Sequence, residues 1–429
     1  MQSNDAPGEG PTTPQQIVIE GVTYDVARYA AKHPGGEILL KYLGRDATAA
    51  FAAFHVASAR KKLAGLKAKA PLVLPESELS SDAERDFAAL HARARDEGLF
   101  ASRPGFFIQQ GLFVTALIAA SVGLVAGFGG AAWSWVTGAL LLGLAWQQAG
   151  WLAHDYLHNS VYPEREKGAL AGLLVGSFYI GFSADWWKVK HNVHHALPNV
   201  LGDDTDIDTL PFLAFSEHEL EKANALTRWL VRLQPLTIVP VLSMARINWC
   251  VQSLLWALRA PNVPNRGREI AAIVAHHLAV IGVMALLPDW GARLGFYLIA
   301  QLSAGLMIGS VFLVGHNARP MLRRDEAPGF YTLQCATTQN ISPMPGMRWF
   351  FGGLDRQTEH HLFPMMPRHQ HDRVVEGVKA LCARHQVTYV DRGFVAGLVD
   401  VWRVLWRVSL AAWRRKDIAP PATPAAVAG

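Results

Sequence analysis

The chain has 429 residues, of which 51% are hydrophobic and only 17% are Asp, Glu, Lys or Arg, compared with about 25% charged residues in soluble proteins. Its formal net charge is +5, and no run of Lys and Arg is dense enough for a nucleic-acid-binding patch. These values exclude a nucleic-acid-binding protein and predict a membrane protein with soluble parts.

The first 90 residues have the composition of a soluble segment. Residues 1–15 are polar and proline-containing, without the apolar core of a secretory signal, and we expect a disordered leader. Residues 16–90 are predicted to form a small α+β domain that begins with a strand-like apolar run. Residues 91–105 are predicted to link this domain to the rest of the chain.

The motif His33-Pro34-Gly35-Gly36 lies within this domain, and His55 follows His33 by 22 positions. Pro-Gly-Gly favours a tight turn that would present His33 at the rim of a pocket. Two imidazoles that face each other across an apolar slot are typical of six-coordinate haem, which transfers single electrons. We therefore predict that His33 and His55 are the axial ligands of haem b, the alternative being a turn residue and a surface residue.

Four apolar segments follow, and each has roughly the 20 residues that a membrane-spanning helix needs. They cover residues 106–128, 131–153, 270–287 and 294–315. Two weaker segments, 170–184 and 236–258, are predicted to be interfacial or re-entrant, because the first is short and the second contains Arg246 and Asn248. We expect a membrane domain over residues 106–415 and a disordered Pro/Ala-rich tail over 416–429.

Lys and Arg are concentrated in two segments, 154–269 and 316–429, whereas the links between paired spans carry little charge. The positive-inside rule places these segments and the N-terminal domain on the cytosolic side. The expected location is the endoplasmic reticulum membrane if the organism is eukaryotic. The Trp- and Arg-rich stretch 401–415 is predicted to lie on the membrane surface or to pack on the cytosolic cap.

The histidines outside the N-terminal domain are clustered, and the clusters follow or lie between the predicted spans. Positions three and four apart share one helix face, so each cluster can direct several imidazoles at one point. The clustered residues are His154 and His158; His191, His194 and His195; and His360 and His361, with Gln357 close by and His316 directly after the fourth span.

This set exceeds the four ligands of one tetrahedral zinc, which predicts two metal ions. Imidazole suits iron, zinc, copper and nickel. A fused haem electron donor has no purpose beside a metal without redox chemistry, so two irons are predicted. The alternative is a set of ordinary surface or capping histidines. His91 and His371 are expected at the surface, and His276 is expected to pack or hydrogen-bond within the third span.

Taken together, these motifs resemble a known family. The His-Pro-Gly-Gly motif with its second histidine resembles cytochrome b5. The segments 154–158, 191–195 and 357–361 resemble the three histidine boxes of membrane fatty-acid desaturases. The fused cytochrome b5 and the glutamine that opens the third box, Gln357, are similar to front-end desaturases, which place a new double bond between an existing one and the carboxyl end.

The resemblance implies a mainly α protein with about four spans, interfacial helices, a cytosolic histidine-rich cap and a small α+β haem domain. It implies that all the clustered histidines, His316 and Gln357 bind two irons. The implied reaction is O2-dependent cis desaturation of a polyunsaturated acyl chain, Δ6 or Δ5 in preference to sphingolipid Δ8. Asp155, Asp204, Asp206 and Glu359 are candidates to orient the imidazoles.

The implied partners are a separate NADH-cytochrome b5 reductase, a fatty-acyl substrate carried by CoA or phospholipid, and membrane lipid. Two other functions remain open from the residues alone. A fatty-acyl or sphingoid hydroxylase could use the same type of diiron site. A membrane-anchored haem protein could carry electrons without any catalytic metal.

Overall fold

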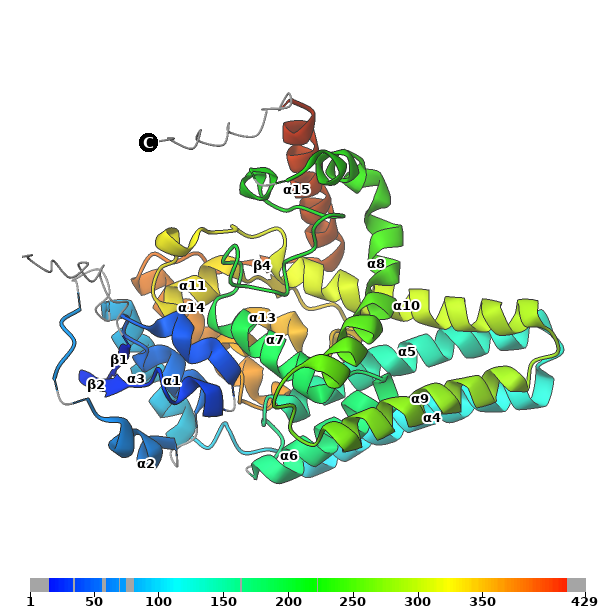
Figure 1. Cartoon of the computed structure of the whole chain (residues 1–429), viewed down its shortest axis with the longest axis horizontal. Coiled ribbons are helices and arrows are strands. Elements are labelled where there is room, and N and C mark those ends of the chain that lie inside the picture. Colours follow the sequence, from blue (N-terminus) through cyan, green and yellow to red (C-terminus); the bar gives the residue numbers. More distant parts are fainter. Residues whose placement is uncertain are drawn as a thin grey trace, which may run out of the picture.

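The computed structural model describes residues 15–33, 35–55, 59–68, 70–74, 81–162, 164–221 and 223–414 (Figure 1). Almost all of the expected leader, the whole expected tail, and Pro34 of the His-Pro-Gly-Gly motif lie outside these residues. In Figure 1 the small N-terminal domain lies at the left, a layer of short helices, the cap, lies in the middle, and long helices project to the right.

The N-terminal domain is built on an antiparallel hairpin of β1 (Gln16–Ile19) and β2 (Val22–Asp25). The turn between them needs positive φ, which Gly21 adopts at 73° without a steric penalty. Short helices follow: η1 (Ala30–Lys32), η2 (Gly36–Tyr42), α1 (Thr48–Phe54), α2 (Arg60–Leu63) and η4 (Ala64–Leu66). Ile17, Ile19 and Val26 form its buried core, and the predicted α+β domain is confirmed.

Helix α3 (Asp82–Asp96) joins this domain to the rest of the chain. It begins at Ser81, whose hydroxyl accepts a hydrogen bond from the backbone N–H of Glu84, as an N-cap residue should. The expected domain boundary at residue 90 falls inside this helix. Its buried face, which includes Phe87 and His91, packs against Phe363 of the cap. His91 is therefore buried and was wrongly expected at the surface.

Four long helices run side by side as a bundle: α4 (Pro104–Phe128), α5 (Ala132–Leu157), α9 (Arg266–Ala285) and α10 (Trp290–His316) (Figure 1). Small residues allow α5 and α10 to approach closely. A Cβ atom on Gly143 would come within 2.9 Å of the carbonyl oxygen of Ala300. In α9, His276 lies 2.9 Å from the carbonyl oxygen of Phe178, which agrees with the expected hydrogen-bonding role.

Among the described residues, four helices are long and apolar enough to cross a membrane: α4, α8 (Ala225–Arg259), α9 and α10. Three of them match expected spans. Helix α5, expected as a span, lies in the bundle but falls outside this set. It carries buried Gln147 and Gln148, whose amides donate to carbonyl oxygens of the cap.

Helix α8, which we expected at the interface, meets the same length and composition criteria. It contains two prolines within the helix, Pro235 and Pro240. In Figure 1 it is bent and runs steeply across the cap end of the bundle instead of along it. Helix α15 (Phe394–Arg414) packs along it, and the indole N–H of Trp402 donates to the carbonyl oxygen of Pro235.

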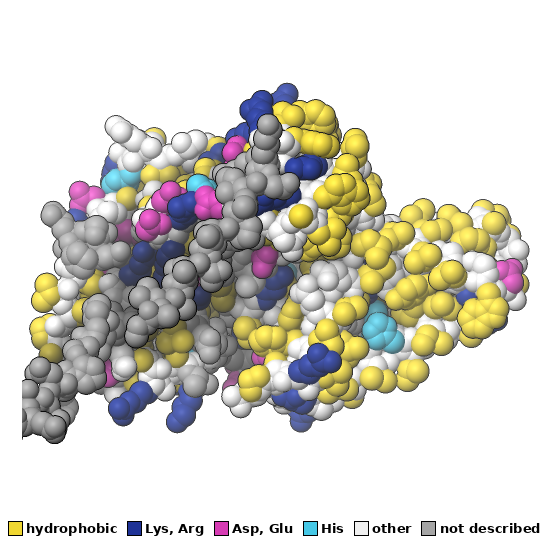
Figure 2. All heavy atoms as spheres, turned by 45° about the horizontal axis from the view of Figure 1, so that its top comes forward, with side chains coloured by type: hydrophobic (Ala, Val, Ile, Leu, Met, Phe, Trp, Pro, Cys, Tyr) yellow, Lys and Arg dark blue, Asp and Glu magenta, His cyan; other side chains and the backbone are white. Residues whose placement is uncertain are grey.

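The expected re-entrant segment 170–184 forms α6 (Arg165–Gly172) and η6 (Leu173–Ile180). Together with α7 (Ala184–Ala196) it makes a pair bent by 106°, which would count as a fifth span if the pair crossed as one unit. Figure 2 shows hydrophobic side chains over the bundle and over the arm of α8 and α15, while charged side chains gather towards the other half of the molecule.

The cap is completed by η7 (Glu217–Leu220), which precedes α8, and by short elements after the bundle: η8 (Arg324–Glu326), α11 (Phe330–Thr337), α12 (Arg348–Phe351), η9 (Leu354–Arg356), α13 (Gln357–Leu362), η10 (Arg368–Arg373) and α14 (Val375–Arg384). Strands β3 (Asn340–Ile341) and β4 (Asp391–Arg392) pair in parallel. The mainly α fold with four candidate membrane helices is confirmed.

Candidate metal centres and haem pocket

Four helices deliver the clustered side chains to one place at the cap end of the bundle. Helix α5 and its C-cap residue supply His154 and His158, and α10 ends on His316. Helix α7 supplies three imidazoles from one face, and the short helix α13 supplies the remaining two together with Gln357. All of these side chains are buried. The sequence clusters therefore converge in space.

The histidines separate into two groups. In the first, five imidazoles offer ligand atoms that all lie within 4.8 Å of one another: His154, His158, His191, His195 and His360. His195 is central, because its Nε2 atom lies 3.1 Å from Nε2 of His191 and 3.0 Å from Nε2 of His360. The group joins residues from α5, α7 and α13.

The second group contains three imidazoles, those of His194, His316 and His361, whose ligand atoms also lie within 4.8 Å of one another. The Nε2 atoms of His194 and His316 are 3.3 Å apart. The side-chain amide of Gln357 lies 2.7 Å from Nε2 of His316, so this group has an amide where the first group has further imidazoles.

These residues fit metal ions. Buried Nε2 atoms of His154, His158 and His361 have no hydrogen-bond partner in the described part of the chain, although buried polar atoms are normally paired. Burial lowers the pKa of His195, His360 and His361 well below the ordinary value, and neighbouring imidazoles lower it further. A neutral imidazole keeps the lone pair that coordinates a metal.

Carboxylates orient two of the imidazoles of α7, as expected. Nδ1 of His191 lies 3.0 Å from Asp206, and Nδ1 of His194 lies 2.8 Å from Asp204. These contacts direct each Nε2 atom into its group. Burial lowers the pKa of His194, but Asp204 more than offsets this, so the pKa lies above the ordinary value.

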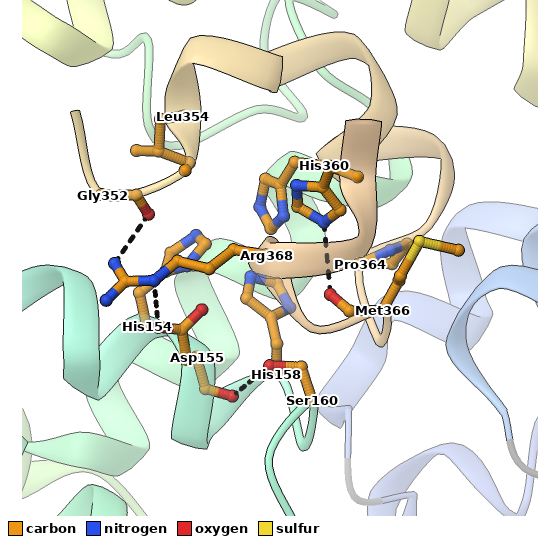
Figure 3. Close-up of a pocket in the computed structure, with 12 residues that line it drawn as sticks. His154, Asp155, His158, Ser160, Gly352, Leu354, His360, Pro364, Met366 and Arg368 are labelled. Carbon is orange, nitrogen blue, oxygen red and sulfur yellow. Dashed lines mark hydrogen bonds and ion pairs between the residues drawn. The ribbon is translucent and has the colours of Figure 1, made fainter. Parts of the chain in front are cut away.

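The other two expected acids have different partners. Asp155 forms an ion pair with Arg368 at 3.3 Å, and the guanidinium of Arg368 also donates to the carbonyl oxygen of Gly352 (Figure 3). Glu359 accepts hydrogen bonds from Asn340 and Tyr389. Both acids fix cap segments around the histidines, because their own neighbours in the fold are cations and donors.

Helix α11 contains two orienting groups that the sequence did not reveal. The amide oxygen of Gln334 lies 2.9 Å from Nδ1 of His361, and its amide nitrogen donates to the carbonyl oxygen of His195. The carbonyl oxygen of Thr337 lies 3.2 Å from Nδ1 of His316. Neither residue belongs to a histidine motif, so no local signal marked them.

A cavity of about 10 Å³ lies beside the first group, between His154, His158 and His360 (Figure 3). That volume corresponds to about one water molecule. His371 also lines it and is buried, with its ring centroid 5.9 Å from that of His360, so the expected surface position of His371 was wrong. Helical spacing alone could not show that η10 folds back over α13.

The N-terminal domain presents the other predicted pair. His33 and His55 come from different segments of the domain, and their Nε2 atoms lie 3.5 Å apart. The ring of Phe51 stacks on that of His55. A Cβ atom on Gly35 would come within 2.9 Å of the ring of His33, so a larger residue there would displace that ring. Two imidazoles that point their Nε2 atoms at each other fit the axial positions of a six-coordinate haem.

A larger cavity of about 950 Å³ lies against both histidine groups. Its lining comes from α5, η6 and the turn after it, α7 and the loop that follows it, α8 and α10, and it is mainly apolar and aromatic. His154 and His191 of the first group and His194 and His316 of the second contribute to its wall. The volume is at the upper end of the range for ligand-binding sites.

Comparisons with known proteins agree with this geometry. Residues 131–393 match the family model for fatty acid desaturases. The chain belongs to the fatty acid desaturase family. Residues 9–71 of this desaturase match the cytochrome b5-like haem/steroid binding domain. The family and the fused domain that the sequence motifs resembled are thereby confirmed, and the desaturase is an oxidoreductase and an integral membrane protein.

Curated relatives extend over most of the desaturase. An acyl-lipid (9-3)-desaturase of Physcomitrium patens is 34% identical over 92% of this chain and 76% of its own length. A delta(6)-fatty-acid desaturase of Caenorhabditis elegans is 32% identical over 85% and 89%. A delta(8)-fatty-acid desaturase of Euglena gracilis is 33% identical over 92% and 94%. The relatives are front-end desaturases, and their similar identities do not separate one double-bond position from another.

Proposed function

We propose that this desaturase introduces a cis double bond at the Δ6 or Δ5 position of a polyunsaturated fatty-acyl chain. Two irons are held by the two histidine groups, the second with the participation of Gln357, and haem b is held by His33 and His55. The observation that carries this proposal is the apolar cavity that has members of both groups in its wall.

When bound, the two irons supply the O2-dependent removal of hydrogen from two adjacent CH2 groups. The chain's own residues supply position. An alkyl chain offers no polar handle, so only the cavity wall can select one C–C bond. Trp151, Trp186 and Phe312 line that wall beside the histidines and give it an apolar surface.

The haem domain supplies electrons that originate from NADH and arrive through a separate NADH-cytochrome b5 reductase. The positive-inside rule places the cap and the haem domain in the cytosol, at the endoplasmic reticulum membrane if the organism is eukaryotic. The acyl chain is presented as a CoA thioester or a phospholipid, both of which place a polar head at the membrane surface.

The test is expression in yeast that is fed an 18-carbon diene or a 20-carbon triene, followed by location of the new double bond. We expect a new Δ6 bond in the shorter acid or a new Δ5 bond in the longer one. A Δ8 bond would contradict the assigned position, and a new hydroxyl group without a new alkene would contradict desaturation.

Two variants separate the proposed metal sites. His194→Ala should abolish the product and leave the haem absorption spectrum intact, because His194 lies in the second histidine group. His33→Ala should remove the haem spectrum. Metal analysis of the purified protein should find about two non-haem irons for each haem, whereas zinc without non-haem iron would favour an electron carrier.

A further inference from the structure

The haem domain makes charged contacts with the cap close to the metal centres. Lys41 of η2 lies 2.6 Å from one carboxylate oxygen of Asp203, and Arg324 of η8 lies 2.9 Å from the other. Arg324 also donates to the backbone carbonyl oxygen of Lys41. The side chain of Asp203 is 14% exposed, whereas those of Lys41 and Arg324 are 38% and 34% exposed, so the bridge has a largely buried acid between two partly exposed cations.

Apolar and polar contacts surround the bridge. The hydroxyl of Tyr42 donates to the carbonyl oxygen of Ala196, the last residue of α7, at 3.1 Å. Tyr42 and Phe54 pack against a buried core of the cap that includes Leu197 and Leu333. Helix α1 of the haem domain also contributes to the core that α3, α11 and α13 share. The domain is therefore packed on the cap over a continuous surface.

One aromatic side chain connects the two cofactor sites in space. Phe54 directly precedes the proposed haem ligand His55. Its ring lies edge-on to the ring of His195, the central imidazole of the first group, with centroids 6.3 Å apart. Arg95 of α3 donates to the carbonyl oxygen of His55 at 2.7 Å and fixes this end of α1.

We propose that Lys41, Asp203 and Arg324 form a latch that holds the haem domain docked on its own cap, and that Phe54 positions it against His195. The haem domain would then reduce the metal centre of the same chain one electron at a time, so that each transfer takes one haem from ferrous to ferric and one iron of that centre from ferric to ferrous. The docked position itself is independent of chemistry, whereas the electron route rests on the function proposed above. The competing arrangement is a tethered domain that reduces neighbouring molecules.

The latch is tested by a zero-length cross-link in the full-length protein in lipid nanodiscs. A carbodiimide joins an ammonium and a carboxylate in contact as an amide, and we expect a linked peptide that joins Lys41 to Asp203. The exposed pair of Lys379 and Glu376, 3.4 Å apart, is the internal positive control. Formation of the control link without the Lys41 link would overturn the docked position.

The electron route is tested by reoxidation of chemically reduced haem after mixing with O2 and acyl substrate, corrected for reoxidation without substrate. We expect a rate constant that does not change over a tenfold range of enzyme concentration, because donor and acceptor share one chain. Asp203→Ala and Phe54→Ala should each slow it at least fivefold without altering the haem spectrum. Asp203→Glu should restore most of the rate.

Asp325→Ala is the matched control, because Asp325 is an exposed acid next to Arg324, and its rate should equal that of the wild type. A rate proportional to enzyme concentration, or unchanged rates in both the Asp203 and Phe54 variants, would contradict the proposal. Absence of any substrate-dependent reoxidation in the wild type would contradict the proposed function, and the cross-link would still decide the docked position.

Discussion

The two histidine groups differ in composition and in support. The first has five imidazoles, whereas the second has three and the amide of Gln357. Asp206, which orients His191 of the first group, is 27% exposed and is also 3.4 Å from Lys190. Asp204, which orients His194 of the second, is fully buried. The comparison indicates that metal binding by the first group depends mainly on the number of its imidazoles. Metal binding by the second group depends more on the buried residues that orient its imidazoles.

The largest effect is expected at the centre of the first group. His195→Ala removes the imidazole that contacts both His191 and His360. Loss of an outer partner alone typically costs about 10–100-fold, so loss of this side chain should cost more than ~100-fold in activity. Metal analysis should show less than two non-haem irons per haem, with an unchanged haem spectrum. Full iron content and full activity in this variant would show that His195 is not a metal ligand.

The orienting acids test the difference in support. Asp204→Asn should lower activity by about 10–100-fold, because a buried imidazole loses its carboxylate. Asp206→Asn should lower it less, because Asp206 is partly exposed and is shared with Lys190. Turnover of the two variants in nanodiscs at equal haem content makes the comparison. A larger loss of activity in Asp206→Asn than in Asp204→Asn would show that the first group depends more on its orienting acid than the second group does.

Gln357 tests whether the amide serves the second group. Gln357→Ala should lower activity by about 10-fold, since it removes a side chain 2.7 Å from His316 and leaves three imidazoles. Gln357→His should keep two irons per haem, because it supplies a fourth imidazole. Thr358→Val, a change at the next position of α13, is the control for local packing. Wild-type turnover in Gln357→Ala would show that the amide takes no part.

The smallest effect on activity is expected for the residue that supports α11, the helix that orients the second group through Gln334 and Thr337. Glu84 of α3 accepts a hydrogen bond from the backbone N–H of Tyr331 in α11. Burial raises the pKa of Glu84 from 4.5 to about 7. The folded state keeps the proton that the unfolded chain releases, so stability falls as pH rises from 4.5 to about 7, by ~3 kcal/mol.

Glu84→Gln should remove this dependence, because the amide stays neutral and its oxygen still accepts the bond. The variant and the wild type should melt at similar temperatures at pH 4.5, and the variant should melt higher at pH 8, with turnover nearly unchanged. Thermal unfolding in detergent at both pH values makes the measurement. A variant that melts lower than the wild type at pH 8 would show that the carboxylate stabilises the cap.

The sequence by itself determined the features that depend on local spacing. Positions three and four apart share a helix face, so the clusters at 154–158, 191–195 and 357–361 predicted that each helix would direct its imidazoles at one point. His33 and His55 were predictable from a turn motif and a second histidine. Long apolar runs marked α4, α9 and α10, because a spanning helix needs little more than length and apolar composition.

Only the tertiary structure decided which distant groups meet. From the sequence, Asp204 and Asp155 were equally good candidates to orient an imidazole. In the structure Asp204 orients His194, whereas Asp155 pairs with Arg368. Gln334 and the contact between Phe54 and His195 join segments about 140 positions apart, which no local pattern encodes. The division of the histidines into five and three was likewise set by packing, because helix spacing fixes a face and only neighbouring helices fix what that face meets.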